Sequence, residues 1–327
     1  MADKFLSCLL TDTASARFML PVIKHWLSEE YPILKRLYLS EEASVILTTL
    51  NQTPEVHIID RYQPHPVTTK SKDIGSVVIS SAGGWPIEHA TKLAAIKSKT
   101  IVIQLIETWY GYRKRLTAND AWNLPNILML VDQIAAREAI SEGIPKEIQR
   151  IVGNPAWEQI KPGTCDIKNT LFIGAPVQKG YGSILGYDEV SAWSLVLKTA
   201  NSFPHLFGEL FYAPHPEQSL PRNLGKAKLT KYRPDKIELF DNYIGMFSAP
   251  LVEAFLAERR TISIQPNHTS LDMCPLSRHG YIRRVSSSDE LIRALKGSFM
   301  SCNKLRKSLQ NSKKRVIETI HEAFLSE

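Results

Sequence analysis

The sequence predicts an α/β protein built from two Rossmann-like domains that face a central cleft. Short β-rich runs alternate with helical stretches in both halves, which is typical of parallel sheets. The alternation pauses over residues 155–169, the expected linker, and starts again at Thr170. A length of 327 residues also favours two domains. We expect an N-terminal domain over 1–155, a C-terminal domain over 170–300 and an amphipathic C-terminal helix over 301–327.

In the first half, Phe18, Val22 and Trp26 recur at helical spacing and predict a helix after the first strand. Another helix is expected from Pro86, because proline needs no N–H partner in a first turn. The β-rich run Ser44–Leu50 fits either state. The predicted strands of this half are Phe5–Leu10, Val56–Ile59, Ser76–Ser80, Thr100–Leu105, Ile127–Val131 and Ile148–Val152.

The second half repeats this pattern. Its predicted helices cover Tyr187–Ala200, Pro250–Ala257 and Ser288–Leu295, the last with Ser288 or Asp289 as N-cap. A tail stripe is expected to pack on the body of the protein, and it consists of Leu305, Leu309, Val316, Ile320 and Phe324. The predicted strands are Thr170–Ile173, Glu209–Ala213, Ile237–Leu239, Tyr243–Met246 and Thr261–Gln265.

Composition excludes several classes of protein. No apolar run approaches the about 20 residues of a membrane helix, and no signal peptide is visible, so we expect a cytoplasmic protein. The cysteines (Cys8, Cys165, Cys274 and Cys302) are scattered, which argues against a zinc or disulfide scaffold. We expect neither a metal nor a cofactor.

Net charge is +7, and residues 298–327 carry six basic side chains against three acidic ones. A solvated helix face is the favoured interpretation of this basic tail. Peripheral contact with a membrane surface is the alternative. Nucleic acid is disfavoured as a partner, because aromatic and basic residues do not interleave.

Ligands of parallel sheets bind at the carboxyl ends of the strands, so the residues after each strand are the candidates. Asp12 follows the first strand, where capping the next helix is an equal alternative. Glu107 follows a strand in a segment with aromatic residues and Arg113, which suits a sugar or base ring and a phosphate. A pair between Glu107 and Arg113 or Arg115 is the structural alternative. Glu107, Asp12 and Glu88 are the candidate bases, in that order.

The second half offers a nucleotide site. A glycine-rich loop begins at Gly174 and carries Lys179, and His215 lies between Pro214 and Pro216 at a strand end. Ser248 and Ala249 open a helix whose N-terminus suits a phosphate, and Glu253, near its first turn, suits ribose hydroxyls. A capped helix with a favourable acid is the alternative. Walker A, Gly-x-Gly-x-x-Gly and Asp-x-Asp motifs are missing.

Four segments together resemble the GT-B superfamily, which includes nucleotide-sugar glycosyltransferases and UDP-N-acetylglucosamine 2-epimerases. They are Ile151–Pro155, Phe211–Pro216, Ser248–Ala254 and Thr261–Pro266. The chain departs from the pattern at Glu258-Arg259-Arg260, where glycine and proline are usual, and in the absence of an epimerase set of catalytic acids. The resemblance implies a GT-B-like fold, nucleotide contacts from His215 and the Ser248–Glu253 helix, and a final helix packed on the first domain.

The resulting expectation is a metal-independent glycosyltransferase. It would move a sugar from a UDP- or CMP-linked donor to a carbohydrate or other hydroxyl acceptor, in surface polysaccharide or glycoconjugate synthesis. The helix dipole at Ser248 would offset charge on the leaving phosphate. The alternatives are a non-catalytic binding protein on the same fold and a sugar-nucleotide epimerase.

Overall fold

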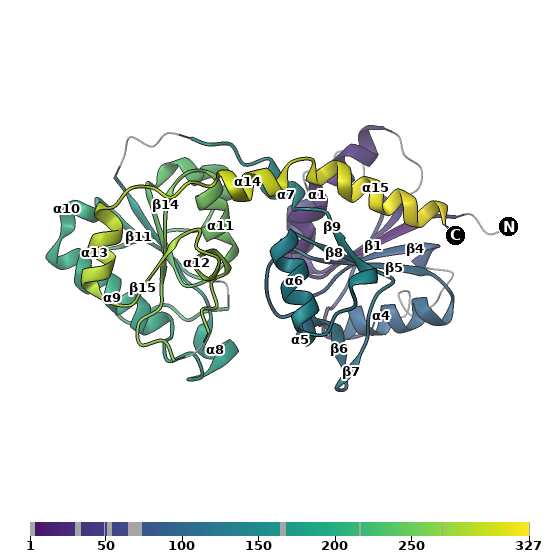
Figure 1. Cartoon of the computed structure of the whole chain (residues 1–327), viewed down its shortest axis with the longest axis horizontal. Coiled ribbons are helices and arrows are strands. Elements are labelled where there is room, and N and C mark those ends of the chain that lie inside the picture. The colour runs from purple at the N-terminus through teal and green to yellow at the C-terminus, as the bar shows by residue number, and fades with distance from the viewer. Residues whose placement is uncertain are drawn as a thin grey trace. The chain divides into compact units, whose positions relative to one another are not determined.

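The chain divides into two compact units in the computed structural model. Unit 1 comprises Met1–Gln159 and Lys307–Glu327, and unit 2 comprises Ile160–Arg306. Each unit has its own parallel sheet with helices packed against it (Figure 1). The structure describes residues 4–29, 34–48, 50, 54–64, 74–163, 168–215, 217–269 and 271–326.

The sheet of unit 1 is parallel throughout its described part and has seven strands there, in the order β3-β2-β1-β4-β5-β8-β9. Its first five strands follow the Rossmann order, which reverses direction between β1 and β4. The strand bounds are β1 Leu6–Leu10, β2 Leu34–Leu39, β3 Glu55–Ile58, β4 Val77–Ser81, β5 Ile101–Ile106, β8 Ile127–Leu130 and β9 Gln149–Ile151.

The helices of unit 1 bury apolar faces against this sheet. Phe18, Val22 and Trp26 of α1 lie in one core with strand residues, as their spacing predicts. Of the undecided run Ser44–Leu50, the residues 44–47 belong to α2, which is capped by the Ser40 hydroxyl. The bounds are α1 Thr13–Ser28, α2 Glu41–Leu47, α4 Pro86–Lys97, α5 Tyr112–Leu116, α6 Gln133–Ser141, the 3-10 helix η1 Lys146–Ile148, α7 Pro155–Glu158 and α15 Ser312–Leu325, with a small hairpin of β6 Thr117–Ala118 and β7 Ala121–Trp122.

Unit 2 repeats the arrangement with six strands in its described part, all parallel, in the order β12-β11-β10-β13-β14-β15. The direction of strand addition reverses between β10 and β13. The strand bounds are β10 Thr170–Ile173, β11 Leu210–Ala213, β12 Lys228–Leu229, β13 Asn242–Gly245, β14 Arg260–Ile264 and β15 Arg283–Val285.

Two local predictions for unit 2 are wrong. Ile237–Leu239, expected as a strand, lies in the 3-10 helix η2, where Tyr243 donates a hydrogen bond to the Ile237 carbonyl. The N-cap of α13 is Ser287, whose hydroxyl accepts from the Glu290 N–H. The bounds are α8 Val177–Tyr181, α9 Glu189–Ser202, α10 Pro204–Phe207, η2 Pro234–Leu239, α11 Ala249–Leu256, α12 Pro275–Arg278 and α13 Ser288–Lys296.

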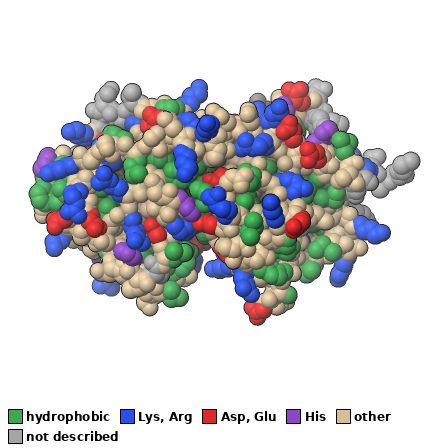
Figure 2. Space-filling model, viewed as in Figure 1, with side chains coloured by type: hydrophobic (Ala, Val, Ile, Leu, Met, Phe, Trp, Pro, Cys, Tyr) green, Lys and Arg blue, Asp and Glu red, His purple; other side chains and the backbone are tan. Residues whose placement is uncertain are grey.

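The C-terminal segment forms two helices, α14 (Asn303–Leu309) and α15, with Asn311 in a left-handed conformation between them. The predicted apolar stripe is buried except for Phe324, which is partly buried. The tail therefore packs on the protein instead of presenting an apolar face. On the face shown in Figure 2, Lys and Arg side chains are spread among acidic ones. Within the described residues, no helix is long and apolar enough to cross a membrane.

Candidate functional site

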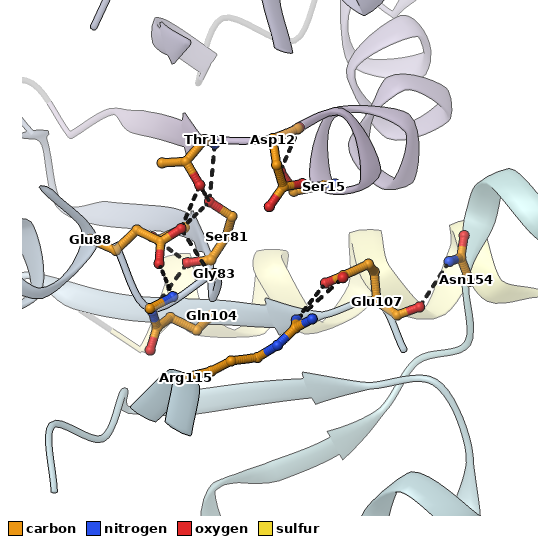
Figure 3. A network of polar contacts seen from close by, with 12 residues as sticks. Thr11, Asp12, Ser15, Ser81, Gly83, Glu88, Gln104, Glu107, Arg115 and Asn154 are labelled. Carbon is orange, nitrogen blue, oxygen red and sulfur yellow. Dashed lines mark hydrogen bonds and ion pairs between the residues drawn. The ribbon is translucent and has the colours of Figure 1, made fainter. Parts of the chain in front are cut away.

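The site in unit 1 lies where the sheet reverses direction, at the carboxyl ends of β1 and β4. Asp12 follows β1 and caps α1, because its Oδ1 accepts from the Ser15 N–H at 2.7 Å. The Thr11 N–H donates to the Ser81 hydroxyl at 3.1 Å and ties this loop to β4. Asp12 thus combines the capping role with a place at the ligand edge of the sheet (Figure 3).

Glu88, in the first turn of α4, is buried beneath these loops. Its Oε1 accepts from the hydroxyls of Thr11 at 2.6 Å and Ser81 at 2.7 Å, and from the Gly83 N–H at 3.1 Å. Its Oε2 accepts from the N–H groups of Gly84 and Trp85, at 2.8 and 3.1 Å. Burial raises the pKa of Glu88, while the hydrogen bonds to the carboxylate oppose that shift. These contacts make Glu88 the anchor of two loops at the strand ends.

Sequence reasoning missed a second buried layer formed by Lys92 and Gln104. The Lys92 ammonium donates to Gln104 Oε1 at 2.5 Å, and Gln104 Nε2 donates to the Ser81 carbonyl at 3.1 Å. Burial lowers the pKa of Lys92 to about 7, and the charge of Glu88 partly opposes this shift. The available signal was spacing, because Lys92 lies four residues after Glu88 and so shares its helix face.

Glu107 follows β5 and pairs with Arg115 of α5. Arg115 Nη1 is 3.2 Å from each Glu107 carboxylate oxygen, and the two side chains are 12% and 14% exposed. Burial raises the pKa of Glu107, Arg115 lowers it, and the charge of Asp12 raises it further. The Tyr110 ring lies 5.2 Å from the Arg115 guanidinium. The charge of Asp12 therefore influences the protonation of Glu107.

The segment around Glu107 is otherwise structural. Trp109, one of the aromatic residues of this segment, is buried, donates to Asp132 at 2.9 Å and stacks on Trp157 with ring centroids 5.2 Å apart. Arg113 is exposed and lies over the Trp122 ring at 5.7 Å. The structure thus brings Arg115, and not Arg113, to Glu107.

The Gly-Asn-Pro motif supports the same edge of unit 1. Asn154 caps α7 through hydrogen bonds from the Ala156 and Trp157 N–H groups to its Oδ1, at 3.1 and 3.3 Å. Its Nδ2 donates to the Glu107 carbonyl at 3.4 Å. The motif therefore holds the chain that carries Glu107.

In unit 2, Gly174, His215 and Ser248 follow the adjacent strands β10, β11 and β13, respectively, at one sheet edge. A Cβ at Gly174 would lie 2.2 Å from Gln218 Oε1, so a side chain here would displace Gln218. His215 Nδ1 accepts from the Glu217 N–H at 3.2 Å, and burial lowers the pKa of His215.

Other predicted residues of this edge differ in their surroundings. Lys179 is exposed and lies 3.4 Å from Glu217. Ala249, the first residue of α11, is exposed. Pro216 lies outside the described residues.

The start of α11 differs from the prediction in one detail. Ser248 is the N-cap by position, yet its buried hydroxyl makes no hydrogen bond with any described residue. Glu253 is buried in the second turn and not in the first, and its carboxylate accepts from the Tyr232 hydroxyl. The unsatisfied Ser248 hydroxyl is available to a ligand at this helix end.

Sequence reasoning also missed two buried residues on the carboxyl side of this sheet. Gln265 follows β14 and donates to Asp272 Oδ1 at 2.5 Å, whereas its own Oε1 has no partner among the described residues. The buried Tyr187 hydroxyl also lacks one there, and burial raises its pKa. Neither residue belongs to a motif that spacing would reveal.

A pocket of about 510 Å³ lies elsewhere in unit 1. It borders the first residues of β1 and β2, at the amino ends of these strands, and is otherwise lined by apolar and ionisable side chains of α1, its C-cap Glu29 and α15. It is therefore separate from the edge that carries Asp12, Glu88 and Glu107.

Comparisons with known proteins identify the fold. No model of a known protein family matches the chain, and no curated protein sequence does. Solved structures do match over nearly the whole chain. UDP-GlcNAc 2-epimerase from Neisseria meningitidis, bound to UDP-GlcNAc, aligns with a TM-score of 0.69 and 13% identity over 97% of this chain and 99% of that one.

Two further structures extend this likeness. UDP-GlcNAc 2-epimerase from Methanocaldococcus jannaschii, in complex with UDP-GlcNAc and UDP, gives a TM-score of 0.68 at 13% identity, covering 97% and 99% of the two chains. Anabaena HepE, in complex with UDP and glucose, gives 0.62 at 10% identity, covering 98% and 100%. The fold is therefore that of GT-B proteins, with two Rossmann-like domains, as the sequence motifs predict.

Proposed function

We propose that this protein acts on a nucleotide-activated sugar and inverts one carbon of the sugar ring. The observation that carries the proposal is the match, over at least 97% of both chains, to 2-epimerase structures that contain UDP-GlcNAc. A UDP-linked sugar is accordingly the preferred substrate, ahead of a CMP-linked one.

The acid–base groups of the proposed reaction come from unit 1. Epimerisation breaks a C–H bond and remakes it on the opposite face, so a proton must be accepted and another returned. Glu107 suits such an exchange because burial raises its pKa above the ordinary value of a carboxyl group, which makes it a stronger base. Asp12 is the second proton-transferring candidate. Glu88 serves here as a positioning residue, because described neighbours donate to both of its oxygens.

The nucleotide is assigned to the carboxyl edge of unit 2. The N-terminus of α11, at Ser248 and Ala249, offers N–H groups and the positive end of a helix dipole to a diphosphate. Gly174 begins the loop that follows β10 at the same edge, and His215 follows the neighbouring strand β11. Lys179 and Glu253 are the charged residues proposed to complete this site.

Glycosyl transfer, the first expectation from the sequence, is the second candidate. The structure of HepE with UDP and glucose favours keeping it, although the other two structures compared above are epimerases. In this scheme Glu107 would deprotonate an acceptor hydroxyl, and Arg113, an exposed cation of unit 1, would bind the nucleotide sugar. This second candidate function also includes contact of the basic tail with an anionic membrane surface.

Incubation with UDP-GlcNAc in D₂O separates the possibilities. An epimerase yields the inverted sugar with UDP still attached and deuterium at the inverted carbon, both visible by NMR. A transferase or hydrolase releases free UDP, and a binding protein leaves the substrate unchanged. Glu107→Gln should abolish the exchange, whereas Glu147→Gln, at an exposed residue of η1, should not. Unchanged UDP-GlcNAc and other UDP-sugars at high enzyme concentration would contradict the proposal.

A further inference from the structure

Three arginines gather at the amino end of the sheet of unit 2, away from the edge that carries His215 and Ser248. Arg259 precedes β14, Arg260 begins it, and Arg283 begins the neighbouring strand β15. Together they line a shallow pocket with Phe299 and Met300. The first two belong to the segment Glu258-Arg259-Arg260, which stands where glycine and proline are usual in the GT-B pattern.

Arg259 is the buried member of the group. Only 4% of its surface is exposed, and its Nε and Nη2 atoms have no hydrogen-bond partner among the described residues. A buried guanidinium that keeps its charge while its N–H groups are unsatisfied is costly for the fold. An anion in the pocket would satisfy both groups at once.

Arg260 adds a second incompletely paired guanidinium. Its Nε is buried and has no described partner, while its guanidinium lies 4.6 Å from the centroid of the Phe299 ring. Burial lowers the pKa of Arg260, and the charge of Asp241 only partly opposes this shift. The charge of Arg260 is thus incompletely compensated by its neighbours.

The nearby acids do not neutralise the group. Glu258 is turned toward Cys302, whose sulfur lies 3.7 Å from Glu258 Oε1. The carboxylate of Asp241 interacts electrostatically with the guanidinium of Arg260. Arg283 contributes a third, exposed guanidinium. Three cations against two nearby carboxylates leave the pocket positive.

We infer that Arg259, Arg260 and Arg283 bind a phosphate group at this edge of unit 2. Planar guanidinium forks match phosphate oxygens, and the shallow pocket suits one phosphate better than a whole nucleotide. Phe299 and Met300, 50% and 43% exposed, give the pocket an apolar rim. A phosphorylated metabolite and a phospholipid headgroup share this chemistry. The inference does not rest on the proposed sugar-nucleotide reaction.

Thermal unfolding of the full chain tests the site with inorganic phosphate as the probe. At matched ionic strength, phosphate should raise the melting temperature of the wild type above its value in chloride, because it binds the folded state. Arg259→Gln should remove this rise. Arg233→Gln, an exposed arginine of unit 2 paired with Asp235, should keep it.

Two further variants keep the test decisive. Arg283→Gln should weaken the rise and serves if Arg259→Gln does not fold, because Arg283 is exposed. Ser248→Ala should retain the rise. A rise lost in Ser248→Ala but kept in Arg259→Gln and Arg283→Gln would place the phosphate at the other edge and overturn the inference. Equal rises in all variants would do the same.

Vesicles distinguish the two sources of phosphate. Co-sedimentation with phosphatidylcholine vesicles that contain phosphatidic acid, reduced by Arg283→Gln, would identify a lipid headgroup. A phosphate-dependent rise in melting temperature without vesicle binding would identify a soluble phosphate ester. Absence of both effects would overturn the assignment.

Discussion

The Arg115 guanidinium lies 3.2 Å from both carboxylate oxygens of Glu107, and both side chains are largely buried. The sequence left Arg113 and Arg115 as equal partners. Side chains two residues apart on an α-helix point about 200° away from each other, so α5 can direct only one of these two arginines to the sheet edge. The resulting pair orients Glu107, while burial raises its pKa.

We therefore expect Glu107→Gln to lower turnover by roughly 10²–10⁴-fold with little change in UDP-sugar binding, because loss of a general acid–base group has an effect of that size. Steady-state kinetics and calorimetric binding measure the two quantities separately. Wild-type turnover in a variant with a normal melting temperature would exclude Glu107 as the proton-transferring group.

Substitutions at Glu253 and Tyr232 distinguish an effect on UDP binding from an effect on the stability of unit 2. Glu253→Ala should weaken UDP binding and also lower the free energy of unfolding by about 1–3 kcal/mol, because Tyr232 loses its acceptor. Tyr232→Phe should lower stability by about 1 kcal/mol and leave UDP affinity close to that of the wild type. Urea titration and calorimetry provide the measurements. Equal UDP affinity in wild type and Glu253→Ala would assign Glu253 a purely structural role.

Glu88→Ala should be among the most destabilising single substitutions in unit 1. It leaves the N–H groups of Gly83 and Gly84 without their carboxylate acceptor, and the Thr11 and Ser81 hydroxyls keep only each other and the Leu9 carbonyl as partners. We expect a loss of about 3 kcal/mol or more in urea unfolding, whereas Glu147→Ala should stay within about 0.5 kcal/mol of the wild type. A small effect at Glu88 would show that water replaces the carboxylate in these loops.

Lys92 predicts a pH dependence of stability. Its pKa is lowered from 10.5 to about 7 in the folded state, so the unfolded chain binds more protons between these values. Stability relative to Lys92→Met should therefore rise with pH across this window, by up to about 1.4 kcal/mol per pH unit, and level off below pH 7. Urea unfolding of both proteins from pH 6 to 10 measures the difference. A difference independent of pH would show that Lys92 keeps an ordinary pKa.

Much of the fold could be predicted because its signals are local. The apolar strand runs and the spacing of Phe18, Val22 and Trp26 report burial directly along the chain. Local preference was insufficient where tertiary contacts decide. The run from Ser44, which the sequence left undecided, is helical in α2, whereas Ile237–Leu239, predicted as a strand, is a 3-10 helix whose Ile237 carbonyl accepts from Tyr243.

For the candidate site, the sequence determined by itself which residues follow the strands, and so identified Asp12, Glu107, His215 and Ser248. Only the tertiary structure decided what each side chain contacts. Those contacts come from long-range partners, such as Ser81 and Glu88 at Thr11, and their positions depend on how distant strands are ordered in the sheet. Strand-end position can be read from a local pattern, whereas burial and pairing of a polar group are set by residues remote in the chain.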